Sequence, residues 1–385
     1  MNVIVPAAGR GTRLRPLTLD RPKPLLHVGG GTLLGHALQP LTDLPVDTWV
    51  FVVGDSGAGG DEVRRFVADR GLAAEYVTQW QPLGQSQAVS LARRWLDGPV
   101  LVFFPDMVFD ADLSWPADGA SGNASPEAGD APADGVLFAQ RVDEPQRFGV
   151  VTVDDARRAT AIVEKPRDRG SDLAVVGAYM IRDGRRLASA IEQQMLLGRR
   201  TKGEFYLADA LQIMIEEGLS FEVREARTWR DCGTLDDLLA TNRFLLERLA
   251  GPETGEDLAR GVTISPDSEV VSGSIGPTVR INAGCRVERS TVGHNVAVGP
   301  RCTIVDSVIG PHVSIESDCT IVGARVSDSV VGEGAVIERA EVAASALAAH
   351  VEIREVNITA ILGSGSRVGS ADGQSRATHQ AIPAP

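Results

Sequence analysis

A glycine-rich loop with nearby cations is the first feature of the sequence that could carry out chemistry. The loop, residues 7–12 (AAGRGT), directly follows an apolar run at 3–5, and Arg13 and Lys23 come soon after it. Backbone N–H groups that no side chain covers can bind phosphate oxygens. A guanidinium fork and an ammonium point charge complement a polyphosphate in different ways. The loop and the two cations predict a phosphate site, and a tight strand-to-helix turn that needs small residues is the alternative for the loop alone.

Two carboxylates stand where a metal ligand would be useful. Asp106 follows the apolar run at 100–104, and the carboxyl end of a central strand is where α/β sheets bind ligands. A carboxylate beside phosphates is a natural Mg²⁺ ligand, and a turn or a helix cap is the alternative for Asp106. Asp231 lies between Trp229 and Gly233, and by itself it is expected to cap the helix predicted at 235–246.

The elements that must position these residues alternate between strands and helices. The runs at 3–5, 49–53 and 100–104 are almost continuously apolar, as in parallel strands that are buried on both faces. Between them, residues 61–67 and 88–96 have helical periodicity. The alternation predicts an α/β fold with a Rossmann-like open mixed sheet and helices on both faces.

The sequence from about residue 261 follows a different, 17-residue period. Three apolar ladders step by 6, 5 and 6 residues, which describes a three-sided coil of parallel strands made of hexapeptide repeats, with one residue lost in each turn. Cys285, Cys302 and Cys319 share the period, so we interpret them as small core residues rather than as a metal or redox site. The ladders are Ile264, Ile281, Val298, Ile315; Val270, Val287, Ile304, Ile321; and Ile275, Val292, Ile309, Val326.

These patterns predict the domain organisation. We expect a catalytic domain at 1–250, with a flexible insertion at 114–135 that is almost entirely Ala, Gly, Pro, Ser and acidic residues. A parallel β-helix is expected at 261–340, and a disordered tail at 361–385.

The overall charge excludes some classes of partner. The net charge is −13, which argues against binding to nucleic acid or to an anionic membrane surface. No apolar run approaches the ~20 residues that span a bilayer, and the N-terminus does not have the pattern of a signal peptide. We therefore expect a cytoplasmic protein.

Several motifs, taken in order, resemble the sugar-phosphate nucleotidyltransferases, or NDP-sugar pyrophosphorylases. The likeness covers roughly residues 1–245, and the trailing coils resemble the left-handed β-helix of long glucose-1-phosphate thymidylyltransferases. The motifs that carry it are AAGRGTRLRPLT (7–18), RPKP (21–24), QWQPLG (79–84), FGVV (148–151), EKP (164–166), GEFYLAD (203–209) and WRDCGT (229–234).

The resemblance implies a reaction in which a sugar 1-phosphate attacks an NTP and pyrophosphate leaves. It implies that Arg13, Lys23 and Lys165 are catalytic, with Lys165 steering the sugar phosphate. It also implies Mg²⁺ as the cofactor, held by Asp106 and Asp231. The nucleotide-binding residues would be Ala8, Gly9, Gly11, Thr12, Gln79 at the base edge and Gly84, which leaves room for the base; the sugar-binding residues would be Gly149, Glu164 and Val175.

The identity of the base and of the sugar stays open. Val175 begins a segment in which amino-sugar-specific members carry an Asn, and the loss of that amide disfavours an N-acetylglucosamine substrate. Family likeness and the spacing from Gln79 to Gly84 favour dTTP or UTP with glucose 1-phosphate, and mannose-1-phosphate guanylyltransferase is the nearest rival. An acetyltransferase β-helix using His294 and His312, and an inactive regulatory subunit, also stay open. The expected partners are the NTP and the sugar 1-phosphate, in a homo-oligomer.

Overall fold

The computed structural model describes residues 1–115, 132–168, 170–249, 261–371 and 374–378. These residues form two compact units. The first unit combines Met1–Gly9 with Ala37–Trp229, and the second combines Arg10–His36 with the chain from Arg230 onward. The units therefore do not follow the domain boundary expected at residue 250, because the segment 10–36 belongs to the unit that contains the C-terminal coils. Most of the insertion predicted at 114–135 lies outside the described residues.

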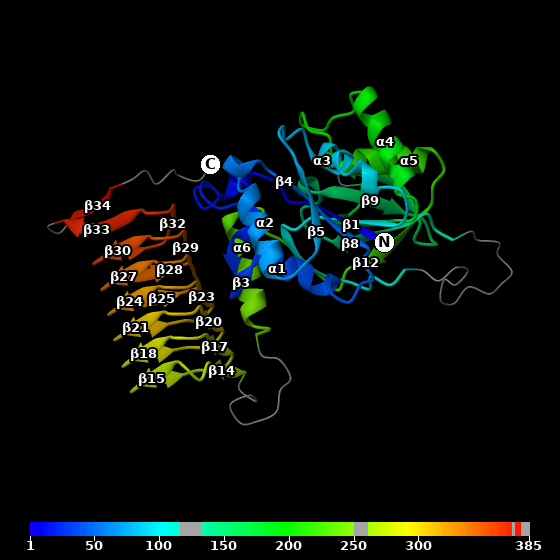
Figure 1. The fold of residues 1–385 in the computed structure, drawn as a ribbon. Helices are drawn as coiled ribbons and strands as arrows, with labels where there is room; N and C mark the ends of the chain where they lie inside the picture. The colour runs from blue at the N-terminus through cyan, green and yellow to red at the C-terminus, as the bar shows by residue number, and fades with distance from the viewer. Residues whose placement is uncertain (116–131, 169, 250–260, 372–373, 379–385) are drawn as a thin grey trace. The chain divides into compact units, whose positions relative to one another are not determined.

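A nine-stranded mixed sheet is the centre of the first unit, as the sequence predicted (Figure 1). Strand β1 pairs in parallel with β4 and β6, β4 pairs in parallel with β5, and β12 with β8, while β11 runs antiparallel to β6, β8 and β9. The strands are β1 (Asn2–Pro6), β4 (Thr48–Val53), β5 (Ala74–Thr78), β6 (Val100–Phe103), β8 (Gly135–Arg141), β9 (Gly149–Val153), β10 (Ala159–Glu164), β11 (Leu173–Ile181) and β12 (Phe221–Glu225).

Three helices, α3, α4 and α5, pack with this sheet around one hydrophobic core. Helices α3, α4 and α5 contact one another, and α2 contacts β5. The helices predicted at 61–67 and 88–96 are present, although the second is shorter and ends in a 3₁₀ turn at Arg93–Trp95. The helices are α2 (Gly60–Asp69), α3 (Gln85–Leu91), α4 (Gly184–Leu196) and α5 (Leu207–Glu216); the short strands β7 (Met107–Asp110) and β13 (Thr228–Asp231) lie outside the large sheet.

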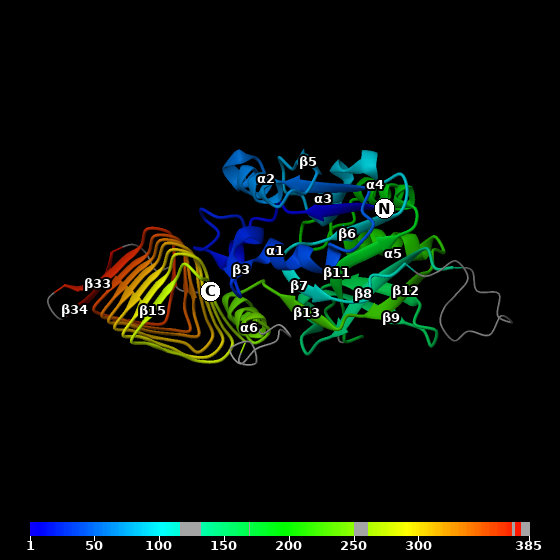
Figure 2. The same cartoon turned by 60° about the horizontal axis from the view of Figure 1, so that its bottom comes forward.

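Three parallel sheets form a β-helix in the second unit, and Figure 2 shows its coils stacked on one another. The first sheet contains β14 (Val262–Ile264), β17 (Val279–Ile281), β20 (Val296–Val298), β23 (Val313–Ile315), β26 (Val330–Val331), β29 (Ala346–Leu347) and β32 (Ile361–Leu362). The second contains β15 (Glu269–Val271), β18 (Arg286–Glu288), β21 (Thr303–Val305), β24 (Thr320–Val322), β27 (Val336–Glu338), β30 (Glu352–Arg354), β33 (Arg367–Ala371) and the antiparallel β34 (Gln374–Thr378). The third contains β16 (Ser274–Ile275), β19 (Thr291–Val292), β22 (Val308–Ile309), β25 (Arg325–Ser327), β28 (Glu341–Ala343) and β31 (Asn357–Ile358).

The strand register confirms the three apolar ladders. Val270, Val287, Ile304 and Ile321 are direct partners in successive coils, and the other two ladders pair in the same way. The sequence predicts that the coils end at residue 340, but in the structure they continue beyond it. Ile315 pairs with Val331, so this coil has 16 residues in place of 17. The shorter coil interrupts the 17-residue period of the sequence, but the strands continue to pair. The tail predicted from residue 361 accordingly begins with β32 and β33.

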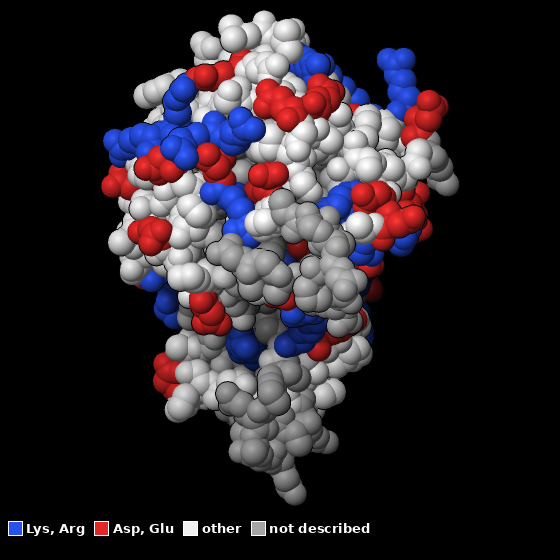
Figure 3. Space-filling model, turned by 90° about the vertical axis from the view of Figure 1, so that its right-hand side faces the viewer, with Lys and Arg blue, Asp and Glu red and all other residues white. Residues whose placement is uncertain are grey.

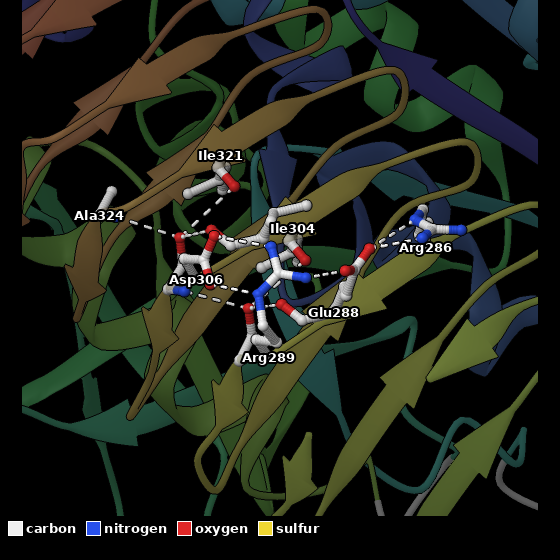
Figure 4. A network of polar contacts seen from close by, with 10 residues as sticks. Arg286, Glu288, Arg289, Ile304, Asp306, Ile321 and Ala324 are labelled. Atoms are coloured by element: carbon white, nitrogen blue, oxygen red, sulfur yellow. Dashed lines mark hydrogen bonds and ion pairs between the residues drawn. The ribbon is translucent and has the colours of Figure 1, made fainter. Parts of the chain in front are cut away.

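Polar side chains join neighbouring coils at one edge of the second sheet (Figure 4). The buried Ser307 hydroxyl donates to the Val305 carbonyl at 2.7 Å and accepts from the Ala324 N–H at 3.1 Å. Next to Ser307 in the sequence, Asp306 forms a two-pronged ion pair with Arg289 of the preceding coil. The Arg289 Nε and Nη2 atoms lie 2.7 and 2.9 Å from the two Asp306 carboxylate oxygens. The buried hydroxyl satisfies a backbone donor that would otherwise lack a partner, so it helps to fix the spacing of the coils.

The cysteine ladder is a core feature of the same stack. The thiols of Cys285, Cys302 and Cys319 are buried and unpaired by disulfides, and each donates to a carbonyl of the following coil at 3.0–3.2 Å. A hydrogen bond with Cys302 and burial raise the pKa of the Cys285 thiol. Protonated, buried thiols are small packing residues, which agrees with the interpretation of the sequence.

Charged side chains of both signs are mixed on the coloured part of the face shown in Figure 3. Lys and Arg lie there among Asp and Glu, and they do not form the extended basic stripe that typically binds a nucleic-acid backbone. Within the described ranges, no helix combines the length and the apolar composition needed to cross a membrane.

The segment 10–36 packs against α6 (Leu235–Leu246) and the β-helix inside the second unit. A short hairpin of β2 (His27–Val28) and β3 (Gly31–Thr32) precedes α1 (Leu33–Leu38). One hydrophobic cluster unites side chains of the segment with α6 and with the sixth strand of the first parallel sheet. Its buried members are Leu14, Leu17, Leu26, Val28, Leu33, Cys232, Leu238 and Ala346.

His27 in this segment is held as a neutral side chain. Its Nε2 lies 2.7 Å from the buried Ser314 hydroxyl. The pKa of His27 is lowered to about 4; burial is the largest cause, the charge of Glu316 opposes it, and the charges of Arg21 and His36 add to the lowering. Between pH 6.5 and about 4, the unfolded chain binds a proton at this position that the folded chain does not bind.

We therefore expect the stability of the protein to fall as the pH is lowered through this window. The contribution of His27 is fully present above pH 6.5, and its loss by pH 4 is about 3 kcal/mol. Thermal unfolding of wild type and His27→Gln between about pH 7.5 and 4.5 measures it, and His350→Asn, at an exposed corner, is the control. The slope with pH should be smaller in His27→Gln alone. An unchanged slope in that variant contradicts the assignment.

Candidate active site

The glycine loop is shaped by a close contact with the lysine that follows it. Gly11 has φ +56°, and a Cβ there would lie 2.9 Å from the Cβ of Lys23 and 3.0 Å from the Thr18 methyl group. The Thr18 hydroxyl also donates to the Gly11 carbonyl at 2.8 Å. Lys23 is only 7% exposed and begins a 3₁₀ turn at Lys23–Leu25. The structure thus joins two of the predicted phosphate-binding residues, while Gly9 and Thr12 of the same loop are exposed.

Arg13 and Asp231 meet at a second glycine of the second unit. A Cβ on Gly233 would lie 2.6 Å from Asp231 Oδ2 and 3.1 Å from Arg13 Nη2, so both side chains pass over this residue. The interpretation of Asp231 as a helix cap is wrong. Thr234 caps α6, with the Thr234 hydroxyl accepting from the Asp237 N–H at 3.3 Å and Asp237 completing a capping box. Asp231 is therefore not required for the start of the helix.

Gln79 and Gly84 lie together in the first unit, at the loop before α3. Gln79 is 8% exposed, and its amide donates to Gln87 Oε1 at 2.5 Å and to the Gly84 carbonyl at 3.4 Å. Gly84 has φ +121°, and a Cβ there would lie 2.6 Å from the backbone N and O of Phe205. A glycine is required at position 84 because the Phe205 backbone lies too close for a Cβ, whether or not a nucleotide base also binds there. Gln87 was not identified from the sequence, where it is one of several glutamines.

A second group of predicted residues surrounds Lys165 in the first unit. Lys165 Nζ lies 3.0 Å from Glu164 Oε1, and the Glu164 side chain is 8% exposed. A Cβ on Gly149 would lie 2.8 Å from Glu164 Oε2 and 3.0 Å from Val175 Cγ2. The structure therefore brings together all four residues that were assigned to the sugar phosphate, although they come from three different strands and the turn after β10.

Tyr206 is the member of this group that residue-by-residue reasoning missed. Lys165 donates to the Tyr206 hydroxyl at 2.6 Å and lies 3.8 Å from the centre of its ring. Burial lowers the pKa of Lys165, but its bonds with Tyr206 and Glu164 raise the pKa above the usual value overall. Burial raises the pKa of Glu164, against the charge of Lys165. Tyr206 lies inside the motif at 203–209, so its position in that motif was the available signal.

Asp106 follows β6 and borders the same buried region as Glu164. Burial, then the charges of Glu164 and Asp106, raise the pKa of Tyr179, so both carboxylates lie close to this phenol. The ring of Tyr179 also packs edge-on against Phe104, with 6.3 Å between the ring centres. The chain continues from Asp106 into the strand β7, so Asp106 does not cap a helix.

The two predicted metal ligands, Asp106 and Asp231, belong to different units. Among the described residues, no group of three or more His, Cys, Asp or Glu side chains could hold a metal ion. Mg²⁺ does not need such a group, because it commonly takes one or two carboxylates and completes its octahedron with substrate phosphates and water. Each carboxylate by itself is of the kind that Mg²⁺ takes when it arrives with a nucleotide.

The fold and these residue groups are those of an enzyme that handles nucleotides and phosphates, and the chain belongs to the nucleotidyl transferase family. The family model described as Nucleotidyl transferase matches residues 2–248. A glucose-1-phosphate thymidylyltransferase of Streptomyces griseus is 31% identical over 306 residues, which cover 75% of this chain and 80% of that protein. A mannose-1-phosphate guanylyltransferase of Mycobacterium tuberculosis is 30% identical over 314 residues, covering 75% and 83% of the two chains.

A solved structure supports the fold independently. The nucleoside-diphosphate-sugar pyrophosphorylase of Vibrio cholerae superimposes with a TM-score of 0.52 at 19% identity, and the match covers 63% of this chain and 99% of that chain. At this identity, the likeness supports the fold alone.

Replacement of Gly84 by alanine should destabilise the first unit. The new Cβ must adopt an unfavourable φ and also displace the Phe205 backbone. Gly71→Ala is the matched control, because Gly71 also has a positive φ (+69°) but nothing lies within 4 Å of its built Cβ. The control should lose about 1 kcal/mol, and Gly84→Ala should lose about 1–3 kcal/mol more. Urea unfolding of both variants measures the difference, and equal losses would exclude the proposed contact.

Proposed function

We propose that this chain transfers a nucleotidyl group from an NTP to a sugar 1-phosphate, giving an NDP-sugar and pyrophosphate. The proposal rests on the group around Lys165. There the buried Glu164 carboxylate, the hydrogen-bonded Lys165 ammonium and Gly149 lie together. A sugar phosphate offers hydroxyl donors and an anionic phosphate, so it needs an acceptor and a cation side by side. The relatives whose names specify glucose 1-phosphate and mannose 1-phosphate support this class of substrate.

Each side chain of this group has a defined role in the proposal. Glu164 accepts hydrogen bonds from sugar hydroxyls, and Lys165 pairs with the phosphate. Tyr206 and Glu164 hold the ammonium in one position before the substrate arrives, which lowers the entropy that binding must cost. Gly149 and Val175 let the sugar approach the strands, since a Cβ at residue 149 would occupy the space beside the carboxylate.

The triphosphate is assigned to the glycine loop. The N–H groups around Ala8, Gly9, Gly11 and Thr12 would bind its oxygens. An oxygen of the sugar phosphate attacks the α-phosphorus, the bond from that phosphorus to the bridging oxygen breaks, and pyrophosphate leaves with the electron pair. Arg13 and Lys23 offset the negative charge that grows on the leaving group, so catalysis consists of positioning and charge neutralisation. Mg²⁺ held by Asp106 and Asp231 would add positive charge at the α-phosphate.

The preferred substrates in this proposal are dTTP or UTP with glucose 1-phosphate. The base edge is assigned to Gln79, whose amide is already oriented by Gln87 and by the Gly84 carbonyl. Mannose-1-phosphate guanylyltransferase is the second candidate, because a relative with this name matches about as well over the same share of the chain. The homo-oligomer and the cytoplasmic location expected from the sequence also remain proposals.

Acetyl transfer by the β-helix and an inactive, regulatory role receive less support. His312 Nε2 lies 3.0 Å from the Asn295 amide and 3.2 Å from Glu247 Oε1, so this nitrogen already has two partners at a corner of the β-helix. An inactive subunit should have lost a residue of the reaction. The residues concerned, all of them present, are Arg13, Lys23, Asp106, Lys165 and Asp231.

The function is tested by measuring pyrophosphate release over a matrix of NTPs and sugar 1-phosphates in the presence of Mg²⁺. We expect the highest kcat/KM with dTTP or UTP and glucose 1-phosphate. Highest activity with GTP and mannose 1-phosphate would select the second candidate. Absence of turnover with every pair would overturn the proposal.

Asp106→Asn should reduce kcat about 100-fold or more without unfolding the protein, because the amide no longer supplies an anionic metal ligand. Asp110→Asn is the matched control, since Asp110 is an exposed carboxylate nearby in sequence that pairs with Arg227. The control should keep its activity. A near-wild-type rate in Asp106→Asn would remove this residue from the metal role.

Gly149→Ala should raise the KM for the sugar 1-phosphate about tenfold and leave the KM for the NTP nearly unchanged. The added methyl group pushes on the Glu164 carboxylate and on Val175. Gly98→Ala, where nothing lies within 4 Å of the built Cβ, is the control. Initial rates with each substrate varied in turn separate the two constants, and an equal rise in both would place Gly149 outside the sugar group.

A further inference from the structure

Arg21, which has no assigned role in the reaction, forms an ion pair with the β-helix. Its Nη1 lies 2.7 Å from both carboxylate oxygens of Glu316, and its Nη2 lies 3.5 Å from Glu333 Oε2. The side chains of Arg21 and Glu316 are only 27% and 18% exposed. Glu316 Oε2 also accepts the Glu333 N–H at 3.1 Å, so the next coil fixes the carboxylate. A partly buried, charge-assisted contact of this kind is stronger and more directional than a surface ion pair.

A second contact joins the same segment to the same coil, six to nine residues further along the chain. The hydroxyl of Ser314, which is fully buried in β23, accepts the Gly30 N–H at 2.8 Å and lies 2.7 Å from His27 Nε2. Ser314 and Glu316 therefore hold the segment at both ends of the stretch 21–30.

The glycine-rich run at 29–31 allows the segment to lie this close to Ser314 and its coil. The Gly29 N–H donates to the buried Asn242 side chain of α6 at 2.8 Å, and a Cβ on Gly29 would collide with Leu245. A Cβ on Gly30, which has φ +78°, would lie 2.8 Å from the Cβ of Ala297 in β20. The glycines allow the backbone to lie directly on α6 and on the β-helix, where any side chain would force it away.

Lys23 lies between these two anchors, in a stretch with little freedom. Pro22 and Pro24 flank it, and Pro22 has φ −62° and ψ 141°. The Leu26 N–H donates to the Lys23 carbonyl at 3.1 Å, and the Lys23 Cβ borders Gly11 of the glycine loop. A displacement of Arg21 or His27 therefore moves Lys23, and with Lys23 the loop that packs on it.

We propose that Glu316 and Ser314 of the β-helix are positioning residues for the nucleotide, because they hold Lys23 and the glycine loop in place through Arg21, His27 and Gly30. The inference rests on the proposed role of Lys23 and the loop in binding the triphosphate. Neither β-helix residue touches the substrate. Their effect is geometric, and a misplacement of about 1 Å in a catalytic group can cost about 100-fold in rate.

Glu316→Gln and Arg21→Gln test this role, with Asp318→Asn as the matched control. Asp318 forms a two-pronged ion pair with Arg301 at 2.6 and 2.7 Å, two residues after Glu316, and that pair does not involve the segment 10–36. Asparagine tolerates the positive φ of this position (+61°), so the control removes one ion pair and little else. All variants are made in the full chain.

The kinetic readout is the KM for each substrate and kcat. We expect Glu316→Gln and Arg21→Gln each to lower kcat/KM for the NTP about tenfold, with the KM for the sugar 1-phosphate unchanged. The double variant should be no worse than either single one, because both remove the same interaction. Asp318→Asn should match wild type. Equal kinetics in Glu316→Gln and wild type, or additive losses in the double variant, would overturn the inference.

Hydrogen exchange of the full chain without substrates separates this inference from the proposed reaction. Amides of residues 10–26 should exchange faster in Glu316→Gln than in wild type or Asp318→Asn, and unchanged exchange there would overturn the inference. If the wild-type protein turns over no substrate pair, the proposed function fails, and direct binding of dTTP and UTP then replaces the kinetics. Faster exchange with weaker nucleotide binding would still support the positioning role, and faster exchange with unchanged binding would overturn it.

Discussion

A cation that is taken partly out of water needs fixed partners, and this requirement organises the functional groups of the protein. Lys165 is held by Glu164 and by the Tyr206 hydroxyl, and Arg21 is held by Glu316. The chain as a whole carries a net charge of −13, so an anionic substrate is attracted only where such cations are concentrated. Each of them depends on a carboxylate or a phenol that a different element supplies.

The β-helix suits the support of a side chain such as Glu316 because neighbouring coils are joined along their strands and at their corners. Its strands pair in register from one coil to the next, and buried serine hydroxyls and thiols satisfy backbone groups at the corners. A side chain such as Glu316 is therefore fixed by the backbone of its own coil and by the Glu333 N–H of the next. The segment that carries Lys23 is packed into the same unit as the stack of hexapeptide coils.

The tertiary contacts also give a packing reason for several of the glycines. Gly11, Gly84 and Gly233 lie in motifs of the sequence, and Gly29 lies in a glycine-rich run. In the structure each marks a place where a backbone approaches another group too closely for a Cβ: Lys23, Leu245, the Phe205 backbone and the Asp231 carboxylate. Phosphate binding and close packing both favour glycine, so the sequence pattern alone does not separate the two causes.

The sequence by itself determined the class of sheet and the three 17-residue ladders, because strand periodicity and fixed spacing are local signals. It also singled out Gly149, Glu164, Lys165 and Val175, which the structure brings together. It did not determine the end of the β-helix, since a coil that is one residue shorter erases the period while the strands still pair. It missed Tyr206 as the partner of Lys165, and Thr234 as the residue that caps α6 in place of Asp231. Only the tertiary structure decided that residues 10–36 belong with the β-helix, because Arg21 and Glu316 are 295 residues apart and no local pattern records a contact over that separation.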